Sequence, residues 1–447
     1  MPKKKEKISK IRLQTHRGMK DILPEEYSLW QWFFEKSKRV LEYYGFSRIE
    51  TPIVEKAELF LRGHGKESEL VQKEMYAFKT KEESELLVLR PEGTAPVARA
   101  YLEHGLFNLI QPVNLYYFGP FFRHERPQFG RYRQFYQLGY EILGGDQPIL
   151  DAEVILIGKA ILNEIGFKDK EIQIFLNSIG CLKCRKKYLK ALKKFYRSNI
   201  KKVCPECQIR YKKNPLRMLD CKSAKCKSIK EKAPSFLDFL CENCNNHFRQ
   251  VLSYLDSLQI DYYLDKTLVR GLDYYTKTVI EFNIETHNKE LSVGGGGRYD
   301  ELIKVLGRID KPAVGMAFGV ERILEIIKSS KFKIEAEKPE IFLIQIGPRA
   351  KEEALKLLER FRKNNIYVLT NLSKDNLKDQ LKLADKLGVN YCLILGQQEI
   401  NNGMIILKDM ISGIQENLPL ERIEEEVKKR LEAKVIVKGS NIKNNEN

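Results

Sequence analysis

The stretch FFRHERPQFGRYRQFYQLGYE, which runs from Phe121 to Glu141, decides the fold. Aromatic and β-branched residues crowd both of its ends, and this pattern extends outward over residues 113–143. The middle, from His124 to Gly130, is polar and is broken by a proline and a glycine. Such a pattern predicts two antiparallel strands joined by a polar turn.

One face of the second strand carries candidate binding residues. Because side chains alternate along a strand, Gln137, Gly139 and Glu141 lie on the same face. An amide and a carboxylate then flank a residue without a side chain, which leaves room for a small polar ligand on the sheet. Arg123, at the end of the partner strand, is placed to bind a phosphate with two nitrogens. An ion pair between Arg123 and Glu141 is the structural alternative.

The flanking segments predict an α+β architecture. Apolar residues recur every three or four positions from Ser28 to Tyr44, which predicts an amphipathic helix, and residues 46–54 are expected to form a strand. Residues 268–284 and 291–320 are again strand and turn, with the glycine run Gly294–Gly297 as a candidate flexible turn. We therefore expect an antiparallel sheet with helices packed against it.

A different composition marks residues 171–260, which we expect to form an inserted, mainly helical domain. This region holds eight of the nine cysteines. Between Cys181 and Lys232 it has nineteen Lys and Arg against three Asp and Glu, a net charge of +16 out of +18 for the whole chain. A basic surface of this kind favours a polyanionic partner such as a nucleic acid, and a solvated lysine surface is the alternative.

The eight cysteines form four close pairs, Cys181/Cys184, Cys204/Cys207, Cys221/Cys226 and Cys241/Cys244. Short spacings of this kind are typical of zinc ligands, whereas stable disulfides are disfavoured in the cytosol. Two four-cysteine Zn²⁺ sites are the simplest interpretation, with reduced and unliganded thiols as the alternative. The spacing does not say which four cysteines share an ion. His247 is expected to be structural, and Cys392 to lie in an apolar core.

Residues 338–434 predict a small α/β domain, because short apolar strands alternate with helices there. The strands are expected at 341–346, 366–369, 391–395 and 404–407, and the helices at 350–363, 377–387 and 420–431. Residues 435–447 have little to bury and are expected to be disordered.

The chain as a whole lacks the features of a membrane or secreted protein. Its 447 residues suffice for two or three domains with sizeable cores. No apolar run reaches the roughly 18 residues of a membrane span, and the first seven residues, MPKKKEK, lack the apolar stretch of a signal peptide. We therefore expect a soluble, cytoplasmic protein that has no membrane partner.

The run from Phe121 to Glu141 resembles motif 2 of class II aminoacyl-tRNA synthetases, and its segment FRHERPQ resembles the histidyl enzymes in particular. Further segments resemble the same family in the expected order: RGMKD from Arg17, LVRGLDYY from Leu268, GGGRYD from Gly295, and the stretch from Ala313 to Arg322. The resemblance covers nearly the whole chain. It implies a class II catalytic domain of residues 1–170 and 261–332, with residues 171–260 inserted, and a C-terminal anticodon-binding domain of residues 338–434.

The same resemblance implies the residues that bind ATP, which the family uses with Mg²⁺. Arg123 would bind the α-phosphate of ATP and the carboxylate of histidine, and Arg270 would be the second arginine on the α-phosphate. Arg322 would hold the γ-phosphate, and Arg131 would face the nucleotide or the tRNA acceptor end. The backbone of Gly294–Gly297 would approach the bound adenylate. Positioning and electrostatic stabilisation by these groups would supply most of the catalysis.

The histidine pocket that the resemblance implies has three parts. The amino group would bind to Glu92, Gly93 and Thr94, and the imidazole ring to Glu141 and Tyr275, with Tyr274 and Gln137 completing the pocket. A carboxylate and a phenol placed for both ring nitrogens would reject analogues that leave these groups unpaired.

Two other classes of protein share some of these features. A non-catalytic relative that senses histidine or uncharged tRNA would be expected to lack the arginines or the C-terminal domain, and both are present here. A zinc-dependent nucleic-acid-binding protein would explain the cysteines but not the other motifs. The resemblance therefore implies an enzyme, a histidine–tRNA ligase acting on L-histidine, ATP and tRNA(His), and it also implies a homodimer.

Overall fold

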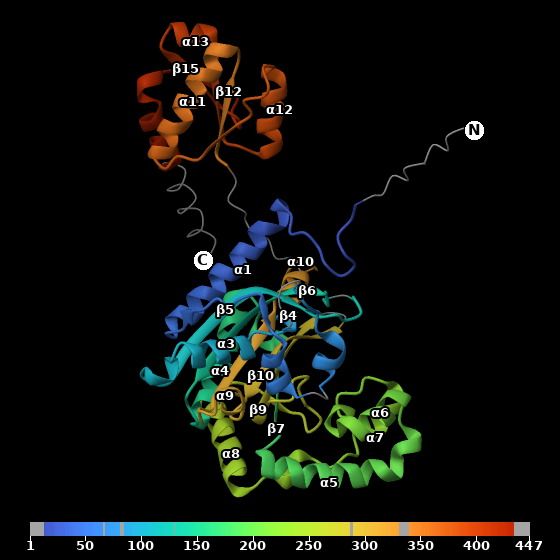
Figure 1. Cartoon of the computed structure of the whole chain (residues 1–447). Helices are drawn as coiled ribbons and strands as arrows, with labels where there is room; N and C mark the ends of the chain where they lie inside the picture. The colour runs from blue at the N-terminus through green and yellow to red at the C-terminus, as the bar shows by residue number, and fades with distance from the viewer. Residues whose placement is uncertain are drawn as a thin grey trace, which may run out of the picture. The chain divides into compact units, whose positions relative to one another are not determined.

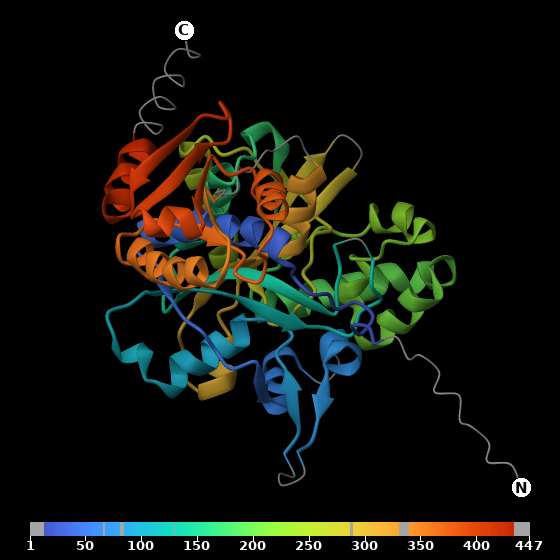
Figure 2. The same cartoon turned by 90° about the horizontal axis from the view of Figure 1, so that it is seen from above.

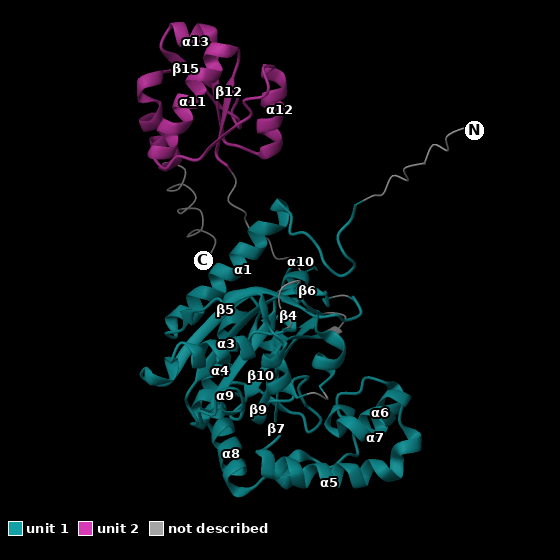
Figure 3. Cartoon of the chain, in the orientation of Figure 1, with its two compact units in different colours: residues 1–332 teal, residues 333–447 magenta. Residues whose placement is uncertain are grey.

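The chain folds into two compact units, residues 1–332 and 333–447 (Figure 3). The computed structural model describes residues 13–65, 68–80, 85–128, 130–286, 289–329 and 339–432. Among these residues no helix is long and apolar enough to cross a membrane. The expected tail, residues 435–447, lies outside the described residues.

The first unit is built on an eight-stranded sheet with the strand order β1-β5-β6-β11-β10-β9-β7-β8. The strands are β1 (Ser47–Arg48), β5 (Val113–Phe122), β6 (Gln134–Leu143), β7 (Ile172–Ser178), β8 (Tyr263–Leu264), β9 (Thr276–Thr286), β10 (Lys289–Arg298) and β11 (Ala313–Gly319). The six inner strands are antiparallel, and only the two short edge strands β1 and β8 pair in parallel. The expected antiparallel α+β architecture is confirmed.

Two differences from the expected strands have local causes. Residues 46–54 form no continuous strand. They make β1 and then leave the large sheet for a smaller one of β2 (Val54–Lys56), β4 (Leu87–Leu89) and β3 (Ala77–Phe78). The intervening Thr51 instead accepts a hydrogen bond on its carbonyl oxygen from buried Arg90 at 2.7 Å. The run Gly294–Gly297 is no turn but part of β10, where a Cβ on Gly296 would lie 2.1 Å from the carbonyl oxygen of Gly315.

Helices pack on this sheet and on one another (Figures 1 and 2). α1 (Pro24–Tyr43) packs on α4 (Pro148–Glu164), which also contacts β11 and α8 (Glu242–Ser257). α1 begins at Pro24 rather than at Ser28, because proline fits the first turn of a helix. The other helices that pack around the sheet are α2 (Ala57–His64), α3 (Thr94–Glu103), α9 (Leu302–Gly307) and α10 (Val320–Ser329).

The cysteine-rich region follows β7 and is mainly helical, as expected. Its helices α5 (Leu182–Asn199), α6 (Pro205–Lys213) and α7 (Ala224–Lys230) form the green lobe at one side of the first unit in both views of the chain (Figures 1 and 2). β7 falls within the range predicted for the insertion, but it pairs with β9 in the large sheet. The helical part of this region therefore begins only after β7, and its exact boundaries as a domain stay a prediction.

A buried ionic group joins the sheet to α8. Arg298 of β10 and Asp151 of α4 form an ion pair in which both side chains are fully buried. The ring of His247 on α8 lies 3.3 Å from the other carboxylate oxygen of Asp151. Burial alone would raise the pKa of Asp151, but the charge of Arg298 and the contact with His247 outweigh it and lower the pKa to about 2. His247 therefore has a structural partner, as expected.

The second unit is an α/β domain, as expected. Its sheet has the order β13-β12-β14-β15-β16, with β12 (Ile341–Gln345), β13 (Val368–Thr370), β14 (Tyr391–Leu395), β15 (Met404–Asp409) and β16 (Gln415–Pro419). α11 (Pro348–Lys363), α12 (Leu377–Leu387) and a helix that is described over residues 423–432 match the predicted helices to within a few residues. β16 escaped prediction because its sequence, QENLP, is polar and mostly exposed. Cys392 is buried in β14, as expected.

Candidate active site

A cavity of about 750 Å³ lies between the antiparallel sheet and the cysteine-rich region. Its wall includes eight of the expected site residues: Glu92, Thr94, Arg123, Arg131, Gln137, Arg270, Tyr275 and Arg322. A smaller cavity of about 160 Å³ shares five of these, namely the four arginines and Gln137. Segments that lie far apart in the sequence therefore meet at one place.

Arg123 and Arg131 stand on either side of one carboxylate. Arg131 donates to Glu125 at 3.1 Å, and a terminal nitrogen of Arg123 lies 4.0 Å from the same carboxylate. The Nε of Arg123 donates to the carbonyl oxygen of Pro91 at 2.8 Å, and its guanidinium stacks over the ring of Phe135. The alternative, an ion pair between Arg123 and Glu141, is not among the contacts of the described residues, and Arg123 and Arg131 both line the cavity.

Arg270 lies flat on β10. It donates to Glu281 of β9 at 2.5 Å, and its side chain is about one-fifth exposed. A Cβ on Gly295 would come within 2.1 Å of a terminal nitrogen of Arg270. Glycine at position 295 is therefore required for this arginine to lie against the strand.

Arg322, at the start of α10, has backbone partners rather than a carboxylate in the described part of the chain. Its Nε donates to the carbonyl oxygen of Gly130 at 2.9 Å, and a terminal nitrogen donates to that of Ser292 at 2.6 Å. Burial, together with the positive charges of the neighbouring arginines, lowers the pKa of Arg322 from its usual value. Arginine stays charged in proteins nonetheless, so this wall of the cavity suits a polyanion.

Glu92 caps the beginning of α3. Its two carboxylate oxygens accept from the backbone N–H groups of Thr94, at 2.6 Å, and Ala95, at 3.0 Å. Burial alone would raise the pKa of Glu92, but His64, 3.5 Å away, and these N–H groups outweigh it and lower the pKa. Glu92 is therefore a negative charge at the cavity wall, suited to a cationic amino group.

Gln137 and Tyr275 line the cavity, whereas Tyr274 is not part of its lining. The carbonyl oxygen of the Gln137 side chain is buried and has no hydrogen-bond partner in the described structure. Tyr274 is buried and donates to Glu92 at 3.4 Å, and Tyr275 lines the cavity. An unsatisfied buried acceptor is costly unless a ligand supplies a donor, so Gln137 is a candidate ligand contact.

Glu141 does not line the cavity, contrary to the expectation that its carboxylate is open to a ligand on the sheet. Its oxygens accept from the hydroxyl groups of Tyr299, at 2.6 Å, and Thr94, at 2.7 Å. The ring of Tyr117 fills the space over Gly139, where a Cβ would lie 2.2 Å from the ring. Burial is the main cause that raises the pKa of Glu141 to about 8. Its part in imidazole recognition stays a prediction.

The ring of Tyr117 also explains why position 93 is a glycine. A Cβ on Gly93 would lie 2.2 Å from Tyr117, so the tyrosine is packed between two glycines, Gly93 and Gly139. Sequence reasoning missed Tyr117, and it also missed His64, Tyr299 and Glu281. A signal for Tyr117 existed in the strand register, because Tyr117 on β5 pairs with Gly139 on β6.

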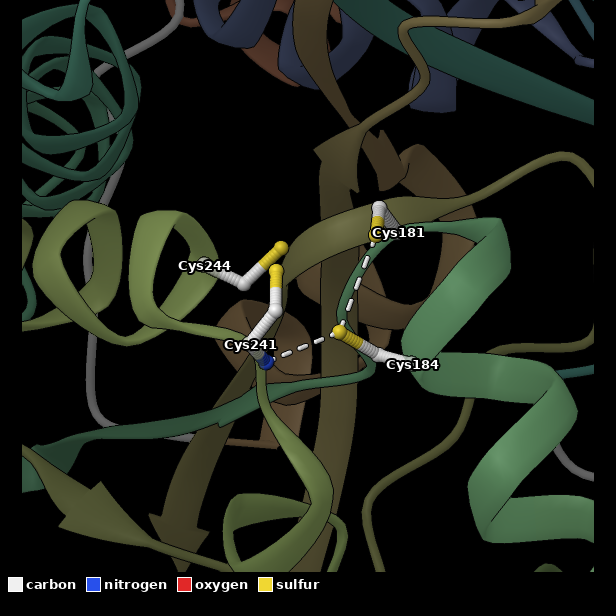
Figure 4. A group of neighbouring side chains, drawn as sticks. All are labelled: Cys181, Cys184, Cys241 and Cys244. Carbon is white, nitrogen blue, oxygen red and sulfur yellow. Dashed lines mark hydrogen bonds between the residues drawn. The ribbon is translucent and has the colours of Figure 1, made fainter.

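The eight clustered cysteines form two groups of four. The outer group joins the first and last pairs, Cys181 and Cys184 with Cys241 and Cys244 (Figure 4). The inner group joins the two middle pairs, Cys204 and Cys207 with Cys221 and Cys226. The structure thus supplies the pairing that the spacing left open.

The geometry of both groups fits a tetrahedral metal. Sulfur atoms at the corners of a tetrahedral zinc site with bonds of about 2.3 Å lie about 3.8 Å apart. The sulfurs of Cys181 and Cys184 are 3.6 Å apart, and those of Cys204 and Cys221 are 3.8 Å apart. All ligand atoms within each group lie within 4.8 Å of one another.

Both groups also receive backbone hydrogen bonds on sulfur. The N–H of Cys241 donates to the sulfur of Cys184 at 3.1 Å, drawn as a dashed line in Figure 4. The N–H of Cys204 donates likewise to the sulfur of Cys226 at 3.2 Å. Such bonds stabilise thiolates, which are the form that binds a metal. These residues could therefore hold two metal ions.

Comparison with known proteins agrees with the geometry. A family model described as histidyl-tRNA synthetase matches residues 18–323, and one described as anticodon binding domain matches residues 340–430. The chain is 43% identical over 409 residues to a histidine–tRNA ligase of Syntrophotalea carbinolica, covering 92% of the chain and 96% of that protein. It is 41% identical over 418 residues to that of Halothermothrix orenii, covering 93% and 99%. The crystal structure of apo histidyl-tRNA synthetase from S. aureus matches with a TM-score of 0.77 at 35% identity, covering 93% of this chain and 99% of that one.

Proposed function

The chain belongs to the histidyl-tRNA synthetase family, and we propose that the cavity on its antiparallel sheet is where the family reaction takes place. That reaction activates L-histidine with ATP, giving histidyl-adenylate and pyrophosphate, and then esterifies the 3′-terminal adenosine of tRNA(His). The observation that carries the proposal is the meeting of Arg123, Arg131, Arg270 and Arg322 at one cavity beside Glu92. A triphosphate needs several cations, and the amino group of an amino acid needs an anion.

In the first step a carboxylate oxygen of histidine attacks the α-phosphorus of ATP, and the bond to the bridging oxygen breaks to release pyrophosphate. We assign Arg123 to the α-phosphate and the histidine carboxylate, and Arg270 to the α-phosphate, where it stabilises the charge that develops during attack. Arg322 holds the γ-phosphate, and Arg131 faces the nucleotide or the acceptor end of the tRNA. Mg²⁺ bound with ATP would add positive charge on the phosphates when present.

Histidine would bind at the inner end of the cavity. The carboxylate of Glu92 receives its amino group, beside Gly93 and Thr94. The hydroxyl of Tyr275 and the free side-chain oxygen of Gln137 are the polar groups that reach the ligand directly. Glu141, which accepts from the hydroxyl of Tyr117 at 3.4 Å, is assigned to the imidazole, and Tyr274 completes the pocket.

We further propose that Zn²⁺ occupies both cysteine groups, because the donor set is four sulfurs at tetrahedral spacing. The second unit, which matches the anticodon-binding model, would contact tRNA(His), and the basic surface of the cysteine-rich region would contact another part of the same tRNA. A homodimer and a cytoplasmic location belong to this proposal as well. The nine free thiols support a reducing compartment.

The experiment that tests the proposal is pyrophosphate exchange into ATP, with each standard amino acid in turn. We expect exchange with histidine alone. Arg270→Ala should reduce the rate on the order of 10²–10³-fold, because it removes a charge aimed at the reacting phosphate. Arg249→Ala, which removes an exposed arginine on α8, is the matched control and should leave the rate unchanged.

A folded, zinc-loaded protein without any exchange would contradict the proposal and would favour a relative that binds histidine or tRNA without catalysis. Exchange with a second amino acid at a comparable rate would contradict the assigned pocket. Zinc analysis of the purified protein that gave no bound metal would contradict the metal assignment alone.

A further inference from the structure

The segment from Arg270 to Tyr275, which carries three of the proposed substrate-binding residues, is held from outside the sheet. Arg185 of α5 donates from one terminal nitrogen to the carbonyl oxygen of Asp273 at 3.1 Å, and from the other to the carbonyl oxygen of Tyr275. The side-chain amide of Asn214 donates to the carboxylate of Asp273 at 2.9 Å. Both donors belong to the cysteine-rich region, so this region fixes one segment of the cavity wall at two points.

Arg185 has no other strong partner in the part of the chain that the structure describes. Its Nε is buried without a hydrogen-bond partner. Burying a charge is expensive unless fixed polar groups replace the lost water. Here the two backbone carbonyls of residues 273 and 275 are those groups. The arginine and the segment therefore fix each other.

Each donor stands beside a different cysteine group. Arg185 directly follows Cys184, which belongs to the outer group. Asn214 directly follows α6, the helix that begins after Cys204 and contains Cys207 of the inner group. A metal ion that fixes four sulfurs also fixes the helix that carries the donor.

We propose that the two cysteine groups, when they hold zinc, position the segment Arg270–Tyr275 through Arg185 and Asn214, so that metal occupancy sets the affinity for histidine. This inference rests on the proposed function of the cavity and on zinc as the metal. It makes Arg185 and Asn214 positioning residues, because they touch the backbone and the carboxylate of the segment and not the substrate.

The inference predicts a selective effect. Arg185 contacts Asp273 and Tyr275, at the end of the segment that faces histidine. Two of the arginines assigned to ATP, Arg123 and Arg322, are held by carbonyl groups elsewhere in the sheet unit. Arg270, at the other end of the segment, is held by Glu281 of β9 at 2.5 Å. Loss of Arg185 should therefore weaken histidine binding and spare ATP binding.

The first test measures pyrophosphate exchange by the full-length, zinc-loaded protein while histidine and ATP are varied separately. For Arg185→Ala we expect the KM for histidine to rise about tenfold, as for the loss of two charge-assisted hydrogen bonds, and the KM for ATP to stay within about twofold. Arg185→Lys, which can reach only one carbonyl, should fall between this variant and the wild type. Arg249→Ala, on the helix of Cys241 and Cys244, is the matched control.

Asn214→Ala tests the inner group in the same way, with an expected rise of about threefold for the loss of one neutral donor. If Arg185→Ala fails to fold, the Asn214→Ala variant still tests the inference. Unchanged KM values for histidine in both Asn214→Ala and Arg185→Lys would overturn the inference. Equal rises in both KM values would overturn it too, because they would show general damage and no positioning.

The second test needs no activity. Hydrogen exchange of residues 270–275 is measured in the zinc-loaded protein and after chelation, with bound zinc quantified in both. We expect these amides to exchange at least about tenfold faster without zinc, and unchanged exchange would overturn the inference. If the wild type shows no pyrophosphate exchange at all, the proposed function fails, but the hydrogen-exchange result still decides whether zinc holds the segment.

Discussion

The antiparallel sheet and the cysteine-rich region face the same cavity but position their side chains by different means. In the sheet, the pairing register of the strands determines where the side chains lie. Tyr117 pairs with Gly139, and Gly295 on β10 leaves room for Arg270. In the cysteine-rich region, short helices follow one another over residues 182–230 without any strand among them, and two groups of four sulfurs lie between them.

The difference lies in where the stability comes from. The sheet has continuous backbone hydrogen bonds and many fully buried apolar side chains, so its geometry needs no ligand. The cysteine-rich region carries a net charge of +16 between residues 181 and 232. Positive charges at this density repel one another. Metal binding by the cysteine thiolates would supply negative charge and folding free energy that offset this repulsion. The same cavity thus has one wall that is fixed by folding and one that we expect to be fixed by metal.

The largest predicted effect is that of zinc removal, which should unfold the cysteine-rich region and leave the sheet folded. Chelation of zinc should remove metal-binding free energy on the order of 10 kcal/mol per site, which is enough to unfold the cysteine-rich region. Hydrogen exchange should show loss of protection over α5, α6 and α7 and retained protection in β5 and β6. Loss of protection in both regions at the same chelator concentration would show that they form one cooperative unit and would break the comparison.

The next effect belongs to the wall fixed by folding. Asp151→Asn removes the fully buried carboxylate that pairs with Arg298, which then keeps Asp300 at 3.2 Å, and should lower the free energy of unfolding by about 3 kcal/mol. Urea unfolding of the zinc-loaded protein measures it. Asp169→Asn, which removes an exposed ion-pair partner of Lys159, is the control and should cost less than about 1 kcal/mol. Equal losses of unfolding free energy in the two variants would mean that burial of the ion pair does not determine the size of the loss.

The sequence predicted the sheet wall far better than the other wall. Gln137 lines the cavity as strand alternation predicted, because a period of two fixes the direction of its side chain on β6. Arg123, Arg270 and Arg322 line the same cavity, but the last two were predicted from the family resemblance and not from periodicity. Glu141 was placed on the correct strand, but its exposure was wrong, because Tyr117 comes from the neighbouring strand and covers Gly139.

The contacts that the cysteine-rich region makes with the rest of the cavity could not be predicted from the sequence. Arg185 lies 90 residues from Tyr275, and Glu69 lies 148 residues from Arg217. No periodicity links such positions. The cysteine spacing predicted two four-sulfur sites but allowed several pairings, and only the packing of α8 back toward the start of α5 selects the nested arrangement. Roles of individual site residues stay predictions until variants are measured.

A smaller effect concerns pH and Glu141. Burial raises the pKa of this carboxyl to about 8 from an ordinary value of 4.5, so the folded protein holds a proton that the unfolded chain releases between these values. The folded state is therefore penalised increasingly as the pH rises from 4.5 to about 8. Glu141→Gln removes this penalty. The Tm of the variant relative to that of the wild type should therefore rise from pH 6 to about pH 8 and stay constant above it, and the KM of the variant for histidine should be higher.

Thermal unfolding of both proteins across this pH range measures the Tm difference. A Tm difference that is constant from pH 6 to 9 would show that Glu141 is already ionised in the folded protein. A KM for histidine that does not change would remove Glu141 from the proposed pocket.

The smallest predicted effect concerns the ion pairs that join Glu69 to the cysteine-rich region. Glu69, which precedes the short helix at Leu70–Glu74, pairs with Arg210 at 3.1 Å and with Arg217 at 2.8 Å. These groups are only partly buried, so the coupling between Glu69 and Arg217 should be about 1 kcal/mol. A double-mutant cycle of Glu69→Gln and Arg217→Met, followed by urea unfolding, isolates it. The coupling should be present with zinc and vanish after chelation, because Arg217 then no longer has a fixed place. A coupling that survives chelation would mean that this part of the cysteine-rich wall is fixed by folding, like the sheet that it faces.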